Sequence, residues 1–161
     1  MAYLREIPSK RISFLSRLTV KLGKFLARFF PLNAVRVWGL RLCGFKIGKN
    51  VYIGSDLIIA SILGCKDCIL EIGDRVAIGP RVTIVLSSDA NWSRLSDVVT
   101  PIRGKVIIKN DTWIGAGAII LPNITIQEMS IIGAGSVVTK DVPSYTVVAG
   151  IPAKIIKKIE L

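Results

Sequence analysis

The chain has 161 residues, 22 lysines and arginines, 11 aspartates and glutamates, and no histidine, so its formal net charge is +11. This length favours a single domain that can bury a core. The absence of histidine excludes Ser-His and Cys-His nucleophilic machinery and every zinc site that depends on imidazole ligands. Hydrophobic residues make up 51% of the chain, and a mean hydropathy of +0.55 is too high for a disordered protein.

The positive charge is concentrated in the first 46 residues, which carry ten basic residues and one acidic residue. The remainder carries 12 basic and 10 acidic residues and is therefore nearly neutral. A basic head on a neutral body indicates an anionic partner, either a membrane or a nucleic acid. No apolar stretch approaches the roughly 20 residues that a membrane-spanning helix needs.

The first element is a predicted amphipathic helix between Ile12 and Phe30, preceded by Pro8 and Ser9 and ended by Pro31. Its apolar and basic stripes have centres roughly 120° apart around the helix. The apolar stripe consists of Leu15, Leu18, Leu22, Phe25, Leu26 and Phe29, and the basic stripe consists of Arg17, Lys21, Lys24 and Arg28.

Two interpretations of this helix stay open. It packs on its own body or on a sister subunit with its charges solvated, or residues 10–30 lie on an anionic membrane surface with Leu and Phe in the lipid. Nucleic acid is not an expected partner, because no recognised binding module accompanies the charge. A second apolar and basic segment, residues 35–43, leads into the body, and residues 1–44 form the predicted helical head.

From residue 45 onward, isoleucine or valine returns every six residues within three blocks. One strand plus one turn takes six residues, so three such units make one coil of a parallel β-helix with this slot pointing inward. A second slot two residues earlier is apolar or small in every case, and glycine follows the first slot in six of twelve cases. The first slot holds Ile47, Ile53, Ile59, Ile72, Ile78, Ile84, Ile108, Ile114, Ile120, Ile126, Ile132 and Val138.

The predicted fold is therefore all-β, with about four coils over residues 45–161. Two insertions interrupt the period: an excursion between Ile59 and Ile72, and a long polar loop over residues 87–104. Residues 147–161 follow as a less regular tail. In a repeat scaffold insertions collect the function, so the long loop is the first place to look for a site.

Three cysteines, Cys43, Cys65 and Cys68, give an odd count, and no cleavable leader pattern precedes them. A reducing cytoplasmic compartment is the simpler interpretation. Three thiolates without histidine are one ligand short of a structural zinc site, so no metal is expected. A redox role is not expected either, because the thioredoxin-like context of a Cys-x-x-Cys pair is missing.

Three segments carry a family resemblance: DTWIGAGA at 111–118, IGAGSVVTKDVP at 132–143 and VAGIPAK at 148–154. With them, residues 45–158 resemble the hexapeptide-repeat acyltransferases, most closely the galactoside/maltose and polysaccharide O-acetyltransferase branches. The resemblance implies a left-handed parallel β-helix, although ordinary parallel crossovers are right-handed. It also implies a homotrimer that binds acetyl-CoA between neighbouring subunits.

Carried over by position, the resemblance assigns six residues to the acyl donor. Small residues line its pantetheine arm, Thr139 and Lys140 lie at its pantetheine and nucleotide end, and two C-terminal lysines face its phosphates. The small residues are Ala116 and Ala134, and the lysines are Lys154 and Lys157. The alternative is that the alanines only suit coil corners and that the lysines belong to a solvated tail.

The family's catalytic base is a histidine 24 residues before the Trp of the Trp-Ile-Gly segment, and here that position is Asp89. Asp89 is the candidate general base, although an aspartate has a pKa of about 3.9 against about 6.5 for histidine. Ser88, Asn91, Trp92 and Arg94 are the candidate acceptor-binding residues. The alternative for Asp89 is a turn residue, since Ser-Ser-Asp-Ala-Asn favours a turn by itself.

Together these observations predict an acetyl-CoA-dependent O-acetyltransferase acting on a sugar hydroxyl of a polysaccharide or lipid-linked saccharide. The expected partners are a homotrimer, acetyl-CoA, a glycan acceptor and an anionic membrane surface. The alternative is a catalytically silent trimeric scaffold or a binding subunit of a sugar-modifying complex.

Overall fold

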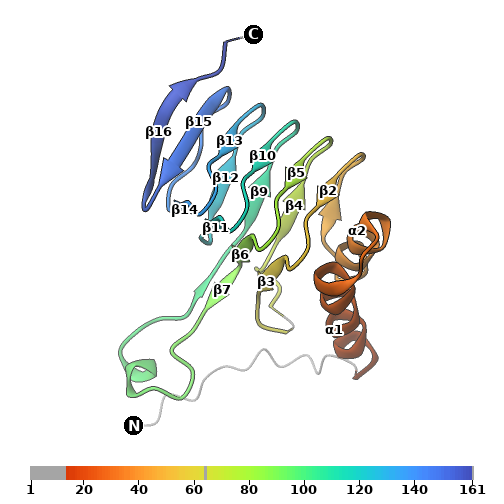
Figure 1. Cartoon of the computed structure of the whole chain (residues 1–161). Coiled ribbons are helices and arrows are strands. Elements are labelled where there is room, and N and C mark those ends of the chain that lie inside the picture. Colours follow the sequence, from red (N-terminus) through yellow and green to blue (C-terminus); the bar gives the residue numbers. More distant parts are fainter. Residues whose placement is uncertain (1–13, 64, 161) are drawn as a thin grey trace.

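The structure is a computed structural model that describes residues 14–63 and 65–160. It is a left-handed parallel β-helix with two α-helices at its N-terminal end, so the predicted fold is confirmed (Figure 1). Residues 1–13, where the predicted head begins, lie outside the described residues, as do Gly64 and Leu161.

The coils have three faces, which we call A, B and C in chain order. Face A contains β1 (Lys46–Ile47), β4 (Leu70–Ile72), β9 (Val106–Ile108) and β12 (Ile124–Ile126). Face B contains β2 (Tyr52–Ile53), β5 (Ala77–Ile78), β10 (Trp113–Ile114) and β13 (Ile131–Ile132). Face C contains β3 (Ile58–Ala60), β6 (Thr83–Val85), β11 (Ile119–Ile120) and β14 (Val137–Val138). Each strand pairs in parallel with its equivalent in the next coil, which confirms the four predicted coils.

The predicted inward slot stacks from coil to coil. On face B, Ile53, Ile78, Ile114 and Ile132 are successive register partners, and all four are completely buried. Parallel strands lie about 4.8 Å apart, so each of these side chains packs directly on its equivalents above and below. Burial of one such side chain contributes about 1.5–3 kcal/mol, and this stack therefore forms the core of the molecule.

The corners between faces depend on two backbone positions. A Cβ on Gly54 would lie 2.4 Å from Pro80 N, and one on Gly115 would lie 2.5 Å from Ala134 N, so glycine after the inward slot allows the next coil to approach closely. The sequence pattern did not indicate the second position. Three residues before the slot, the backbone φ is positive at Asn50, Asp56, Arg75, Arg81, Asp111, Gly117, Asn123, Met129 and Gly135. Arginine and methionine disfavour this conformation, and the stacked coils impose it.

The long loop forms an arm rather than an unstructured loop. It contains β7 (Ser87–Ser88), the short 3₁₀ helix η1 (Arg94–Asp97) and β8 (Ile102–Arg103). Strands β7 and β8 pair antiparallel, with Ser87 opposite Arg103. The arm leaves the coils directly after β6 and projects away from them (Figure 1).

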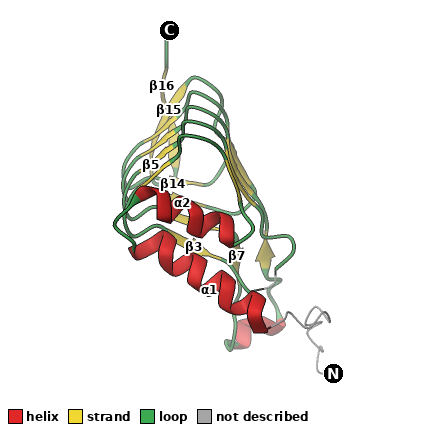
Figure 2. Ribbon diagram, turned by 90° about the vertical axis from the view of Figure 1, so that its right-hand side faces the viewer, coloured by secondary structure: helices red, strands yellow, loops and turns green. Residues whose placement is uncertain are grey.

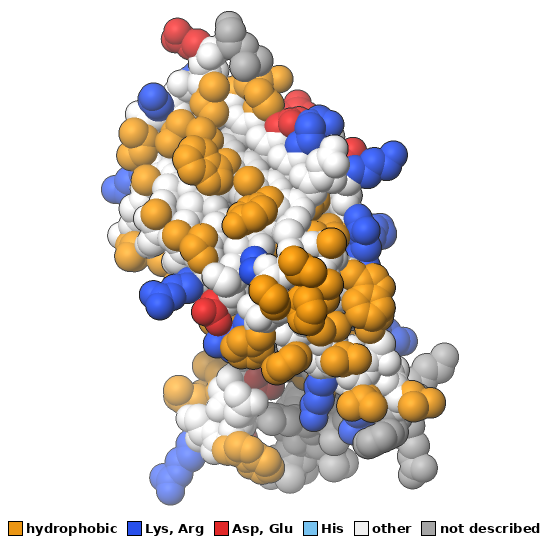
Figure 3. Space-filling view, turned by 45° about the vertical axis from the view of Figure 1, so that its right-hand side comes forward, with side chains coloured by type: hydrophobic (Ala, Val, Ile, Leu, Met, Phe, Trp, Pro, Cys, Tyr) orange, Lys and Arg blue, Asp and Glu red, His pale blue; other side chains and the backbone are white. Residues whose placement is uncertain are grey.

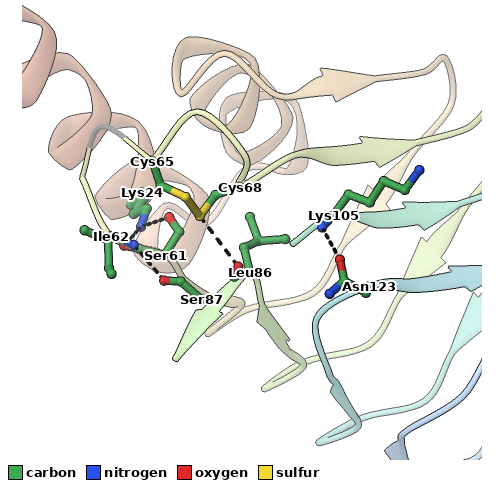
Figure 4. Close-up of a disulfide and its surroundings, with 9 residues drawn as sticks. All are labelled: Lys24, Ser61, Ile62, Cys65, Cys68, Leu86, Ser87, Lys105 and Asn123. Carbon is green, nitrogen blue, oxygen red and sulfur yellow. Dashed lines mark hydrogen bonds between the residues drawn. A yellow bond between two sulfur atoms is a disulfide. The ribbon is translucent and has the colours of Figure 1, made fainter. Parts of the chain in front are cut away.

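The excursion between β3 and β4 contains a disulfide between Cys65 and Cys68, with their Cα atoms 5.3 Å apart (Figure 4). The sequence did not indicate this pairing. Its cause is local, because backbone bonds from Cys65 N to Ile62 O and from Ile69 N to Asp67 O turn the chain back on itself. The turns bring the two cysteines within the ordinary reach of a disulfide.

The C-terminal segment is regular, so the predicted less regular tail is wrong. Strand β15 (Thr146–Gly150) extends face B, and β16 (Ala153–Lys158) returns antiparallel to it. Gly150, at φ 105°, permits the reversal. The hairpin gives the exposed edge of β15 a backbone partner.

The head consists of α1 (Phe14–Phe29) and α2 (Asn33–Leu42), close to the two segments predicted from the sequence. Helix α2 covers the open end of the first coil, where Val37 and Leu40 join the buried core. Helix α1 lies on the outer side of α2 (Figure 2). The two helices meet at Gly23 and Gly39, where a Cβ on Gly23 would lie 2.5 Å from Gly39 O.

The packed side of α1 is not its apolar stripe. Gly23 and Ala27 are buried, and Lys24 Nζ donates hydrogen bonds to the carbonyl oxygens of Ile59 and Ser61. Apart from the half-buried Leu26, the stripe is exposed: Leu15, Leu18, Leu22, Phe25 and Phe29. Helix α1 therefore packs on its own body, as one of the two interpretations expected, but small residues on another side of the helix make this contact and the apolar stripe does not.

We expect Gly54→Ala to destabilise the fold by about 1–3 kcal/mol, because the new methyl group would overlap the backbone of Gly79 and Pro80. Chemical denaturation measures the free energy of unfolding. Ser55→Ala, at the neighbouring exposed position, is the matched control and should change it little. Equal stability of the two variants would contradict the close approach of the coils.

Burial raises the pKa of the Cys43 thiol to about 11, and the nearby Lys24 charge acts in the opposite direction. The folded chain then keeps a neutral thiol at pH values where the unfolded chain ionises it. This thiol therefore contributes stability below about pH 9 that is lost as the pH rises toward 11. Unfolding free energies measured in reductant between pH 8 and 11 should fall more steeply for the wild type than for Cys43→Ser. Parallel curves would refute the shift.

Candidate functional site

The candidate base lies near the start of the arm, one residue beyond β7. Asp89 is half-buried, and its Oδ1 accepts a hydrogen bond of 2.8 Å from Asn91 N. Asn91 Nδ2 donates to the Asp89 carbonyl oxygen at 3.1 Å, and Asn91 adopts a positive φ of 48°. These contacts form a turn of the kind that aspartate and asparagine favour. The carboxylate therefore has a structural contact as well as its predicted catalytic role.

The other acceptor candidates surround this turn on the surface of the arm. Ser88 is exposed on β7, and Trp92 is completely exposed. Arg94 is exposed at the start of η1, whose first turn is capped by the hydroxyl of Ser93. Asn91 is hydrogen-bonded to Asp89 at the start of the arm, and Trp92 and Arg94 follow on the same arm.

Three of the residues predicted to bind the acyl donor, Ala116, Ala134 and Lys154, lie along the corner between faces B and C. Ala116 and Ala134 occupy equivalent positions in successive coils, and Gly135 N donates to Ala116 O at 2.8 Å. One coil further on, the register places Gly150 in this row, and Ala149 directly before it pairs with Lys154 of β16. The line therefore offers small side chains, backbone polar groups and, at its C-terminal end, a cation.

The remaining donor candidates lie elsewhere. Thr139 and Lys140 are exposed where face C ends, at the corner from which the arm departs in an earlier coil. Lys157 lies opposite Val147 on face B. The outer surface of face C thus separates the arm, Thr139 and Lys140 from the line of Ala116, Ala134 and Lys154.

Two grooves in the described part of the chain lie away from these two groups. A shallow groove follows face A, with Lys46, Glu71 and Lys109 in its lining, and a second one lies beside the disulfide. Neither groove contains a predicted site residue.

Other charged side chains bond to one another and serve the coils. Arg75 forms two hydrogen bonds of 2.6 and 2.7 Å to the Asp111 carboxylate, which hold the pKa of that carboxyl below its ordinary value. The Lys46 ammonium likewise lowers the pKa of Glu71. Within residues 14–63 and 65–160, no group of three or more acidic, cysteine or histidine side chains could hold a metal ion.

The sequence interpretation missed the outer surface of face B. Tyr52 and Trp113 are more than half exposed there, and Ile131 and Val147 continue the same row. The equivalent outward row on face A is mixed and consists of Lys46, Glu71, Ile107 and Thr125. The signal was present in the repeat, because the residue before each inward slot must point outward.

Residues 105–140 match the family model of the bacterial transferase hexapeptide (six repeats). A galactoside O-acetyltransferase of Escherichia coli (strain K12) is 37% identical over 113 residues, which are 70% of this chain and 53% of the relative. The chain spans about half the length of the curated relatives it matches.

Solved structures match over more of their length. A maltose O-acetyltransferase from Clostridium difficile 630 is 31% identical, with a TM-score of 0.61 that covers 92% of this chain and 90% of the other. A hexapeptide-repeat acetyltransferase from Vibrio cholerae, complexed with acetyl-CoA, shares the fold with a TM-score of 0.63 and 23% identity, over 91% of this chain and 88% of the other.

The six-residue register, the arm that interrupts it and these similarities agree with one another. The chain belongs to the hexapeptide-repeat acetyltransferase family.

Proposed function

We propose that this protein is an acetyl-CoA-dependent O-acetyltransferase that acts on a sugar hydroxyl. The observation that carries the proposal is the arm: it interrupts the coils of an acetyltransferase fold and presents the carboxylate of Asp89 24 residues before Trp113. The exposed Trp92 indole offers a flat apolar surface on which a sugar ring can stack, and Arg94 and Ser88 offer hydrogen bonds to its hydroxyls.

In the proposed reaction the acceptor hydroxyl oxygen attacks the thioester carbonyl carbon. Its proton passes to the Asp89 carboxylate, the new C–O bond forms, and the C–S bond breaks to release the CoA thiolate, which takes up a proton. The hydrogen bond from Asn91 N to Oδ1 orients the carboxylate. Aspartate is a weaker base than histidine by about 2.6 pKa units, so we expect a rate one to two orders of magnitude below that of a histidine site.

We propose that the site is completed between protomers of a homotrimer. Two observations support this: face C separates the arm from Ala116, Ala134 and Lys154 within one chain, and face B has an apolar outer row containing Tyr52 and Trp113. An exposed apolar row of this kind is typical of a surface that another chain covers. Lys154 and Lys157 would then bind the donor's phosphates, with Thr139 and Lys140 along its length.

We place the enzyme in the cytoplasm, at the inner face of the membrane, with a polysaccharide or lipid-linked saccharide as acceptor. The basic head supports this location, since ten of the first 46 residues of the chain are basic.

A non-catalytic trimeric scaffold is the second candidate. One observation favours it: the Asp89 carboxylate already accepts a backbone hydrogen bond that shapes the turn. In that case the arm would bind a glycan without reacting with it.

Asp89→Asn separates the two roles of this side chain, because the amide oxygen still accepts the hydrogen bond from Asn91 N but cannot take a proton. We expect acetyl transfer from acetyl-CoA to fall by 10²–10⁴-fold with an unchanged melting temperature. Asp97→Asn, on the same arm and exposed, is the matched control. Asp89→His should raise the rate. Full activity in Asp89→Asn would remove the base assignment, and no turnover or CoA binding by the wild type would favour the scaffold.

Lys154→Ala and Lys157→Ala should each weaken CoA binding at least roughly tenfold, because a charge-assisted hydrogen bond to phosphate contributes about 1.5–3 kcal/mol. Isothermal titration calorimetry measures the dissociation constant. Lys158→Ala, the exposed neighbour on β16, is the control and should bind CoA as the wild type does. If all three variants bind alike, these lysines do not contact the donor.

A further inference from the structure

Helix α1 presents an exposed apolar stripe on the outside of the molecule. Leu15 is 70% exposed and Phe25 is 58% exposed, with Leu18, Leu22 and Phe29 between and beyond them at similar values. The spacing of three and four residues places all five side chains on one side of the helix. Figure 3 shows hydrophobic side chains gathered over this helical end of the molecule. A contiguous exposed surface of this kind marks an interaction site.

The packing of the head keeps this stripe outward. Helix α1 contacts α2 through Gly23 and buries Ala27, which lie roughly 140° around the helix from the centre of the stripe. Lys24, from the basic stripe, also points inward and bonds to the carbonyl oxygens of Ile59 and Ser61. The helix cannot turn its leucines and phenylalanines onto the coils without losing these contacts.

Cations flank the stripe on its solvent side. Arg17, Lys21 and Arg28 are exposed, and the Arg28 guanidinium carbon lies 4.8 Å from the centre of the Phe29 ring. The sequence has no acidic residue between Glu6 and Asp56. Helix α1 itself contains no acidic residue, and Arg28 lies 3.5 Å from the carboxylate of Asp56 in the first coil. A surface that combines leucine, phenylalanine and an excess of basic side chains is complementary to anionic lipid headgroups over an apolar layer.

We propose that the apolar stripe of α1 docks on an anionic lipid surface, with the helix in the plane of the interface. No helix in the described part of the chain is long and apolar enough to cross a membrane. A second copy of the same stripe is a poorer occupant, because it would bring Arg17, Lys21 and Arg28 of both chains to one apolar contact, where like charges repel. Lipid phosphates neutralise these charges instead.

The docked orientation has a consequence for the acceptor. Figures 1 and 2 both place the tip of the arm at the same end of the molecule as α1. Docking therefore brings the arm, with Asp89 and Trp92, toward the lipid surface, where a lipid-linked saccharide presents its hydroxyls. This consequence rests on the proposed function, whereas the docking itself does not.

Vesicle co-sedimentation of the full chain tests the docking without any acyl donor, so its failure would leave the acyltransferase proposal intact. We expect binding to vesicles of phosphatidylglycerol and phosphatidylcholine, at least about tenfold weaker binding to phosphatidylcholine alone, and weakening by salt. The double variant Leu22→Gln with Phe25→Gln should lose binding to both. Ile155→Gln with Ile156→Gln, which removes two equally exposed apolar side chains from β16, is the matched control and should bind as the wild type does.

The cationic contribution has its own pair of variants. Arg17→Gln with Lys21→Gln should weaken binding to anionic vesicles at least about tenfold, whereas Lys66→Gln with Lys158→Gln, outside the head, should not. Circular dichroism and light scattering of each variant report fold and mass. The proposal fails if the wild type binds no vesicle, or if the stripe variant binds as well as the control. It also fails if the stripe variant keeps its fold but changes its mass, which would assign the stripe to a second copy.

Discussion

The structure depends on the stacking of one isoleucine or valine on its equivalent in the next coil. This contact recurs on all three faces and fixes the register, since Ile53, Ile78, Ile114 and Ile132 must coincide for any of them to be buried. A slip of one residue would turn the whole row outward. The stack is strong enough to impose a left-handed backbone on Arg75, Arg81 and Met129 at the corners. Its rigidity makes the coils a frame on which less constrained segments can be inserted.

The arm shows how that frame serves a site. Its two ends are fixed in successive coils, and the antiparallel pairing of Ser87 with Arg103 makes its base rigid. Beyond this base the chain is free of the six-residue register, so the packing of the coils does not determine which residues stand at Asp89, Asn91 and Trp92. The corner of Ala116 and Ala134 is the opposite case, because the backbone of each alanine lies close to a glycine of the preceding coil and the packing of the coils favours small residues there.

The two helices of the head cover the open end of the first coil. Val37 and Leu40 of α2 cover this end, and α1 packs on α2 through small residues such as Gly23. Five large apolar side chains of α1 consequently face outward, beside the exposed cations Arg17 and Lys21. The head therefore completes the core through α2 and exposes an apolar surface on α1.

The sequence by itself determined the β-helix, its four coils, the inward and outward positions, the two helices and the place of the arm, because each follows from periodicity along the chain. By counting back from Trp113, the resemblance also identified Asp89 as the residue at the position of the family's histidine base. Only the tertiary structure decided which side of α1 is packed, since Leu26 and Gly23 lie on neighbouring sides and the choice depends on the shape of α2. The pairing of Cys65 with Cys68, the hairpin of β15 with β16 and the separation of the donor candidates by face C were likewise decided there. Each of these depends on how segments are arranged in space, and a local sequence pattern contains no information about that arrangement.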